Sequence, residues 1–158
     1  MLIIELVVMS LLCVAVVTAA DAALTHPDPD ARAILAIERA AFERWARGDL
    51  TGFLEASDQE VDYFDPFLDA RLEGLPALRA LYANLPAVEV DRWEMISPRV
   101  VVSCDMGVLT FNFVSYTQRG ATRWNTTEVY QRKDGQWRII HTHWSLTKPE
   151  LAREPADQ

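Results

Sequence analysis

The chain has 158 residues, which fits one domain with a sizeable core. Half of its residues are apolar, 24% are charged, and the formal charge is −8 at pH 7, a balance that is ordinary for a soluble globular protein. The acidity argues against a nucleic-acid partner and an anionic membrane surface, because both need clustered Lys and Arg. The two cysteines make no disulfide framework, and Cys104, in a valine-rich run, is expected to be a small buried hydrophobe.

The amino terminus, residues 1–22, has the composition of a secretory signal peptide. Leu2 to Ala20 is almost wholly apolar, and small residues around Ala20 resemble a cleavage site. Glu5 lies inside the run and no Lys or Arg precedes it, which departs from the usual pattern. We expect an exported protein, periplasmic or secreted, with no membrane contact once processed. The alternatives are a retained membrane anchor and a cytoplasmic protein with an over-extended start, whose true first residue is Met9.

Helices are predicted between residue 28 and Pro86. Asp28-Pro29 is a helix start, an N-cap followed by proline at the first helical position. Apolar residues then recur at helical spacing as far as Trp45, and Gly48 stands in the C′ position that ends a helix. Asp49 can cap a short second helix, and Pro76 opens a third.

After Pro86 the pattern changes to strands. Beyond a short strand at 61–66, we predict one long strand over 88–103, bent or bulged at Ser97-Pro98, and three more at 108–117, 122–132 and 137–147. Asp134-Gly135 is the strongest hairpin signal in the chain. Helices followed by an antiparallel meander make the α+β pattern. Residues 23–29 are expected to be a linker, 30–147 the folded domain and 148–158 a polar tail.

Three stretches resemble the SnoaL-like (nuclear transport factor 2-like) superfamily. The first is RGDL at 47–50. The second runs from VDYFDP at 61–66 through LEG at 72–74 into the third predicted helix. The third comprises TEVY at 127–130 and DGQWRIIHTHWS at 134–145. The resemblance implies a SnoaL-like domain over 30–147: a cone-shaped, curved antiparallel sheet packed on N-terminal helices, also called cystatin-like.

Two groups within this superfamily are similar to parts of the chain. The third stretch is similar to the association domain of calcium/calmodulin-dependent kinase II, where a DG turn, a Trp and a His-x-His strand recur. The second is similar to ketosteroid isomerase, whose catalytic base is an aspartate directly before a proline; Asp65 matches it. Glu128 matches that enzyme's protonated oxyanion donor. Its oxyanion tyrosine on the first helix has no counterpart, since that place falls near Ala41, which argues against steroid isomerase activity.

Strand alternation assembles a candidate site around these two carboxyls. Tyr63 shares a strand face with Asp65, Trp124 shares one with Glu128, and on the last strand one face carries Ile140, Thr142 and Trp144. The resemblance implies that Asp65, Glu128 and Trp144 point into the cone. Burial and repulsion would raise at least one carboxyl pKa. We therefore predict Asp65 as a base and Glu128 as an acid or oxyanion donor, with a ligand held by Tyr63, Trp124, Thr142 and Trp144.

Each of these residues also has an explanation without catalysis. Asp65 can cap a turn through its carboxylate. Glu128 can pair with Arg123, Arg132 or Arg138 on neighbouring strands. The aromatic side chains can simply fill the core.

The histidines of the last strand, His141 and His143, share the face opposite Trp144. We predict no metal site there, because no third ligand is evident. The resemblance makes the outer sheet face a dimer surface, so we expect packed histidines and a homodimer.

Two functions stay open for the domain. One is a cofactor-independent isomerase, dehydratase or cyclase that uses paired carboxylates on a small apolar carbonyl compound. The other is a non-catalytic ligand-binding or oligomerisation domain.

Overall fold

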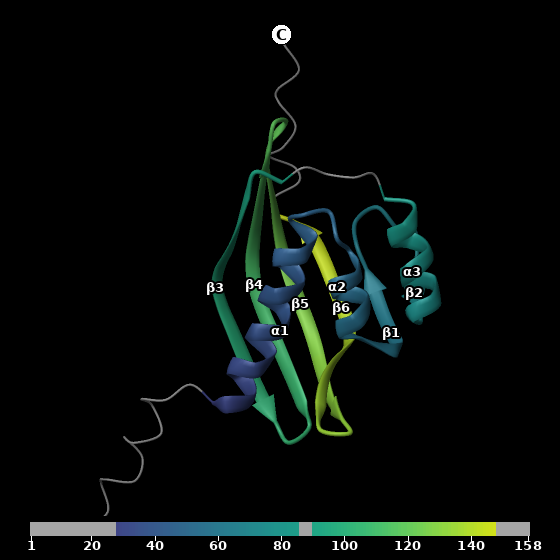
Figure 1. Cartoon of the computed structure of the whole chain (residues 1–158), viewed down its shortest axis with the longest axis vertical. Coiled ribbons are helices and arrows are strands. Elements are labelled where there is room, and N and C mark those ends of the chain that lie inside the picture. The colour runs from purple at the N-terminus through teal and green to yellow at the C-terminus, as the bar shows by residue number, and fades with distance from the viewer. Residues whose placement is uncertain (1–27, 86–89, 148–158) are drawn as a thin grey trace, which may run out of the picture.

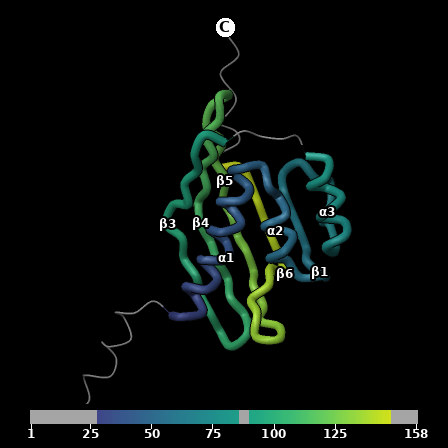
Figure 2. The backbone as a smooth tube through the Cα atoms, in the orientation of Figure 1, coloured from purple at the N-terminus to yellow at the C-terminus, as the bar shows by residue number. Residues whose placement is uncertain are grey.

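The computed structural model describes residues 28–85 and 90–147, in which helices pack on one face of a six-stranded sheet (Figures 1 and 2). The expected signal peptide, most of the linker and the polar tail lie outside these residues. Among the described residues, no helix is long and apolar enough to cross a membrane.

The first helix begins at its predicted capping residue, and the other two begin close to their predicted start signals. In α1 (Pro29–Trp45), Asp28 accepts a hydrogen bond from the backbone N–H of Asp30 at 2.8 Å. Beyond the end of α1, Gly48 takes a φ of 81°, a left-handed turn conformation that favours glycine. Asp49 accepts the N–H of Thr51 at 3.0 Å just before α2 (Thr51–Ala56), but the N-cap residue of this helix is Leu50, which makes no side-chain capping bond. The third helix, α3 (Leu75–Ala83), has Pro76 in its first turn.

The strands are β1 (Ser57–Phe64), β2 (Leu72–Glu73), β3 (Arg92–Ser103), β4 (Met106–Thr117), β5 (Gly120–Lys133) and β6 (Gln136–Leu146). They lie in the order β2-β1-β6-β5-β4-β3, and β3 to β6 form the expected antiparallel meander. The sheet is not antiparallel throughout, because β1 runs parallel to β6. A parallel pair needs a long connection, and most of the domain lies between these two strands.

Two β-bulges set which side chains face the helices. In β3 the register shifts between Ile96 and Arg99, with Ser97 at a φ of 49°, which confirms the predicted bulge. In β6, His141 pairs with β5 before the shift and Ile139 after it, so Ile140 is the extra residue. Strict alternation was therefore wrong here: Ile139, not Ile140, shares the buried face with Thr142.

The cysteine at position 104 corrects a further expectation. It lies in the turn between β3 and β4 with a φ of 55° and is exposed. The valine-rich run ends at Val102, two residues before it, so the apolar context that predicted burial does not extend to the turn.

Phe42 of α1 lies at the centre of an aromatic cluster that joins the helix to the sheet. Its ring stacks on Phe113 of β4 at 4.4 Å between centroids and meets Phe53 of α2 edge-on at 5.1 Å. Trp144 of β6 contacts it edge-on at 6.0 Å. These contacts fix α1 across the inner face of the sheet, while no described helix covers the outer face (Figure 1).

We predict that Gly107→Ala lowers the free energy of unfolding by about 1–3 kcal/mol through overpacking. A β-carbon on Gly107 of β4 would overlap Cδ1 of the fully buried Ile34 in α1. The Ile34→Val change removes that atom, so the same substitution should cost less in an Ile34→Val background. Urea unfolding of the four proteins measures the coupling. Equal costs in both backgrounds would contradict this close approach.

Candidate functional site

The helix-facing side of β5 carries the polar centre of the domain. Trp124, Thr126, Glu128 and Tyr130 follow one another on this face, and the last three are buried. Glu128 is 1% exposed. Alternation along the strand predicted this row, and the pairing of β5 with β4 and β6 keeps it in register.

A second buried carboxyl, Glu38 of α1, was not singled out from the sequence. It is 0% exposed, and the hydroxyl of Tyr130 donates a hydrogen bond to its Oε2. Its Oε1 is buried without a hydrogen-bond partner. The signal was present, because Glu38 stands four residues after Ile34 and four before Phe42, within the apolar stripe that faces the sheet.

Glu128 is held by a hydroxyl and not by an arginine. Thr142 Oγ1 of β6 donates to Glu128 Oε2 at 2.6 Å, across the strand pair that sets the two residues opposite each other. Arg132 pairs with Asp30 at 2.9 Å, and Arg138 donates to the backbone oxygen of Glu55. Neither of these neighbouring cations therefore neutralises Glu128.

The two buried carboxyls titrate at unusually high pH. Burial raises the pKa of Glu38 from 4.5 to about 7, although the hydrogen bond from Tyr130 lowers it in part. Burial raises the pKa of Glu128 well above 4.5, and the negative charge of Glu38 raises it further. Glu38 is therefore the first of the pair to ionise as the pH rises. The charge acting on Glu128 belongs to Glu38, not to the Asp65 that the sequence paired with it.

Asp65, the candidate base, lies half-buried just beyond β1. Its Oδ1 accepts the backbone N–H of Phe67 at 2.7 Å, so it caps a turn as the non-catalytic explanation expected. Asp65 also acts on Tyr63. Burial raises the pKa of Tyr63 above its ordinary value, and the charges of Tyr82 and Asp65 raise it further, as does a hydrogen bond with Asp65. The two roles are compatible in one carboxylate.

The fold brings all three carboxyls to one tyrosine. Burial raises the pKa of Tyr82 on α3, and the charges of Glu128, Glu38 and Asp65 raise it further, in that order. Its ring meets that of Tyr63 edge-on at 6.3 Å. Tyr82 is thus within electrostatic reach of both predicted carboxyls, Asp65 and Glu128, and of Glu38.

The two predicted tryptophans lie toward the aromatic side of this region. Trp144 contacts Trp124 edge-on at 5.9 Å and also packs in the Phe42 cluster, so it contributes to the core. Trp124 in turn meets the ring of Phe67, just after Asp65-Pro66, at 6.0 Å. Phe67 is 74% exposed, so this contact lies at the solvent side of the region.

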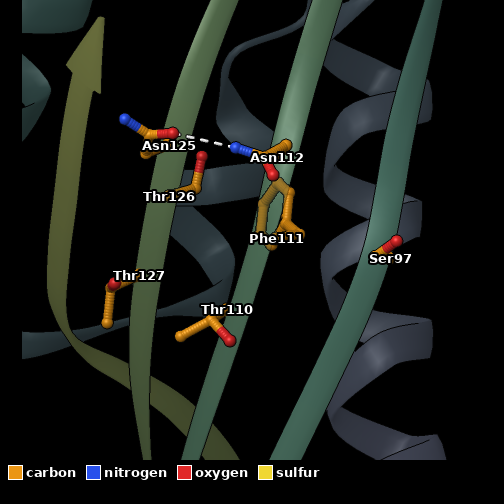
Figure 3. Close-up of a pocket in the computed structure, with 7 residues that line it drawn as sticks. All are labelled: Ser97, Thr110, Phe111, Asn112, Asn125, Thr126 and Thr127. Carbon is orange, nitrogen blue, oxygen red and sulfur yellow. Dashed lines mark hydrogen bonds between the residues drawn. The ribbon is translucent and has the colours of Figure 1, made fainter. Parts of the chain in front are cut away.

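The outer face of the sheet has different chemistry. A hollow of about 310 Å³ is lined by Ser97, Thr110, Phe111, Asn112, Asn125, Thr126 and Thr127, with Asn112 donating to Asn125 at 2.8 Å (Figure 3). Of these residues, Phe111 and Thr126 belong to the buried rows that face the helices. The hollow contains no titratable group. His141 and His143 lie on this face against Phe64, at 6.0 and 5.7 Å between rings. Within residues 28–85 and 90–147, no group of three His, Cys, Asp or Glu could hold a metal.

We predict that the domain becomes less stable as the pH rises from about 4.5 to about 7. The folded-state pKa of Glu38 is raised, so its stabilising contribution is complete below 4.5 and is lost as the pH passes through 7. For a shift from 4.5 to about 7 the loss is on the order of 3 kcal/mol. Glu38→Gln cannot ionise and should make this slope shallower, with Glu128 supplying the remainder, whereas Glu43→Gln, exposed on the same helix, should leave the slope unchanged. Urea unfolding across this pH range measures both; parallel curves for Glu38→Gln and the wild type would contradict the prediction.

Comparison with known proteins agrees with this architecture. A family model described as SnoaL-like domain matches residues 39–140. A proposed ketosteroid isomerase from Parabacteroides distasonis shares 45% identity, with a TM-score of 0.67 over 74% of this chain and 87% of that one. The calcium/calmodulin-dependent kinase II hub of S. rosetta shares 22% identity, with a TM-score of 0.65 over 77% of this chain and 100% of that one.

A proposed dehydratase of the nuclear transport factor 2-like family from Streptomyces avermitilis has 19% identity and a TM-score of 0.62, over 77% of this chain and 99% of that one. At such identities the likeness to the hub and the dehydratase shows the fold alone. No curated protein matches the chain. The family model covers more than half of the sequence, and the chain belongs to the SnoaL-like family.

Proposed function

We propose that the domain binds a small apolar carbonyl compound against the inner face of its sheet and moves a proton on it without a cofactor. This is chemistry of the isomerase, dehydratase or cyclase kind. The observation that carries the proposal is Glu128, a fully buried carboxyl among aromatic rings, bonded to a hydroxyl and not to a cation. Such a group stays protonated and can donate a hydrogen bond to a developing oxyanion.

The geometry of Glu128 favours donation toward a ligand. Thr142 donates to Oε2, so the carboxyl proton belongs on Oε1. A carbonyl oxygen that accepts this proton's hydrogen bond becomes more electrophilic, and the negative charge that develops on it is stabilised.

Asp65 supplies the complementary group. As a carboxylate it would take the proton from the carbon beside the carbonyl; the electrons of that C–H bond form the enolate double bond, and the carbonyl electrons move to the oxygen that faces Glu128. Return of the proton to another carbon completes an isomerisation, and loss of a leaving group completes a dehydration. Tyr63 and Tyr82, which lie near both Asp65 and Glu128, add apolar surface and hydroxyls beside the ligand.

The relative at 45% identity, named as a proposed ketosteroid isomerase, supports this class of chemistry. The place of the isomerase tyrosine near Ala41 is buried in the helix–sheet contact, so a steroid as the particular substrate has less support than a smaller ketone.

A second candidate function, assembly as a homodimer, is supported by the outer face. Phe64, Ile96, Val101 and Val108 are each at least 36% exposed. The strand register places all four on the face that carries His141 and His143. Exposed apolar side chains gathered on one face of a sheet are typical of an interface. The similarity to kinase hub domains is compatible with assembly, and dimerisation does not exclude the carbonyl chemistry on the inner face.

We predict exchange of the hydrogens beside the carbonyl of 2-tetralone, an apolar ketone, with deuterated solvent. Wild-type protein should exceed the buffer rate, and Asp65→Asn and Glu128→Leu should each lower this excess by roughly 100-fold or more, because each removes one partner of the proton transfer. Asp62→Asn, on the opposite face of the same strand, should exchange like the wild type. Mass spectrometry of the ketone measures the rate. Exchange that survives both site substitutions would mean that another group acts as the base.

We predict that the wild-type domain is a dimer at micromolar concentration and that Val108→Asp makes it monomeric. The substitution puts a charge beside the exposed Val101 on the outer face, where a dimer would bury it without a partner. Ala36→Asp, at an exposed position of α1, adds the same charge elsewhere and should leave the dimer intact. Light scattering after size exclusion gives the mass; a monomeric wild type would rule out this assembly.

A further inference from the structure

We propose that Glu38 is a positioning residue that adds to the effect of burial in keeping Glu128 protonated near neutral pH, by taking the negative charge of the buried pair onto itself. This inference rests on the proposed function in one respect, namely that the proton of Glu128 forms a hydrogen bond to a ligand. The sharing of charge between the two carboxyls is a property of the protein without ligand.

The contacts of the two carboxyls differ in a way that decides which one ionises. Glu38 accepts a hydrogen bond from the phenol of Tyr130, a more acidic donor than an alcohol, and that bond favours its charged form. Glu128 accepts from the alcohol of Thr142. Glu38 also has an unpartnered buried oxygen, Oε1, which would be left without any hydrogen bond in a purely structural acid–phenol pair.

The strand geometry makes the two groups neighbours. Glu128 and Tyr130 are two residues apart on the same face of β5, and the Tyr130 hydroxyl reaches Glu38 on the overlying helix. The negative charge of Glu38 therefore develops within electrostatic reach of Glu128, and both side chains are buried away from water. A like charge at short range in such a region opposes ionisation of the second carboxyl.

The other titratable groups that face the pair do not change this order. They are Tyr130 of β5, Tyr82 of α3 and Tyr63 of β1, all with pKa values raised by burial, so they stay neutral. Asp65, beyond β1, acts on Tyr63 and Tyr82. Among the described residues, no Lys, Arg or His nitrogen lies within 4 Å of a carboxyl oxygen of Glu38 or Glu128, so neither glutamate forms an ion pair there. The charge state of the region therefore depends on the two glutamates.

The test is a pH titration of protein labelled with ¹³C at the glutamate side-chain carboxyls, followed by NMR without ligand. In the wild type, Glu38 should titrate first, near pH 7, and Glu128 at higher pH. In Glu38→Gln, the Glu128 titration should move down by about one pH unit or more, because the opposing charge is gone. In Glu128→Gln, Glu38 should still titrate near pH 7, since it ionises while its neighbour is neutral. Glu43→Gln should change neither.

A Glu128 titration that is the same in Glu38→Gln and the wild type would overturn the proposal, as would a Glu38 titration that falls in Glu128→Gln. Tyr130→Phe gives a second measurement that retains both carboxyls. Loss of the phenol should raise the pH at which Glu38 titrates, and an unchanged Glu38 titration in this variant would also count against the proposal.

Binding of 2-naphthol separates this proposal from the proposed function. Its hydroxyl imitates an enol, so the pH above which binding is lost should follow Glu128 and move down in Glu38→Gln. If naphthol does not bind and tetralone does not exchange, the proposed function fails while the NMR titration still decides the role of Glu38. If naphthol binds with the same pH limit in both proteins, the proposed function stands and the role of Glu38 falls.

Discussion

Two carboxyls are buried in a core that offers them hydroxyls and, among the described residues, no cation, and this is the constraint on which the site depends. Moving a carboxylate out of water costs several kcal/mol unless it is paired, and a group in this position takes up a proton instead. Here Tyr130 and Thr142 supply the hydrogen bonds, while the arginines and lysine that form ion pairs do so at the periphery, as Arg132 does with Asp30. Peripheral pairs of that kind contribute little stability. The polar centre thus reduces stability near neutral pH and retains chemically useful protons.

Features of the fold remote from the carboxyls hold them in place. Ring contacts around Phe42 fix α1 on the sheet, and helical spacing then directs Glu38, one turn earlier, toward Tyr130. The bulge at Ile140 changes the alternation in β6 so that both Ile139 and Thr142 face inward, and Thr142 comes opposite Glu128. Without that extra residue, β6 would present His141 to Glu128 or lose its apolar contact at Ile139.

Most of the fold was predictable because its signals are local. Asp28-Pro29, the Asp134-Gly135 hairpin and the bulge at Ser97-Pro98 each depend on backbone preferences of one or two residues. The parallel pairing of β1 with β6 was not predictable in this way, since it joins segments about 80 residues apart. Glu38 is not predicted for a different reason: helical periodicity identifies a buried face by its apolar residues, and a charged residue within that face adds nothing to this signal. A glutamate flanked at i−4 and i+4 by Ile34 and Phe42 is itself the signal of a buried acid.

The position of the acid on α1 also changes what the site can do. In ketosteroid isomerase, which this chain resembles, the first helix contributes a tyrosine that is a second neutral donor to the oxyanion. In this chain the position of that tyrosine falls near Ala41. The helix contributes the carboxyl of Glu38 instead. The tyrosine comes from the sheet, as Tyr130, and its hydroxyl is already used by Glu38. An ionised carboxylate cannot donate a hydrogen bond. An oxyanion in this site would therefore have Glu128 as its main donor, and the strength of that donor depends on the charge of the neighbouring Glu38. Such a site suits a substrate whose enolate is moderately stable by itself, for example a conjugated or aryl ketone, more than one that needs two strong donors.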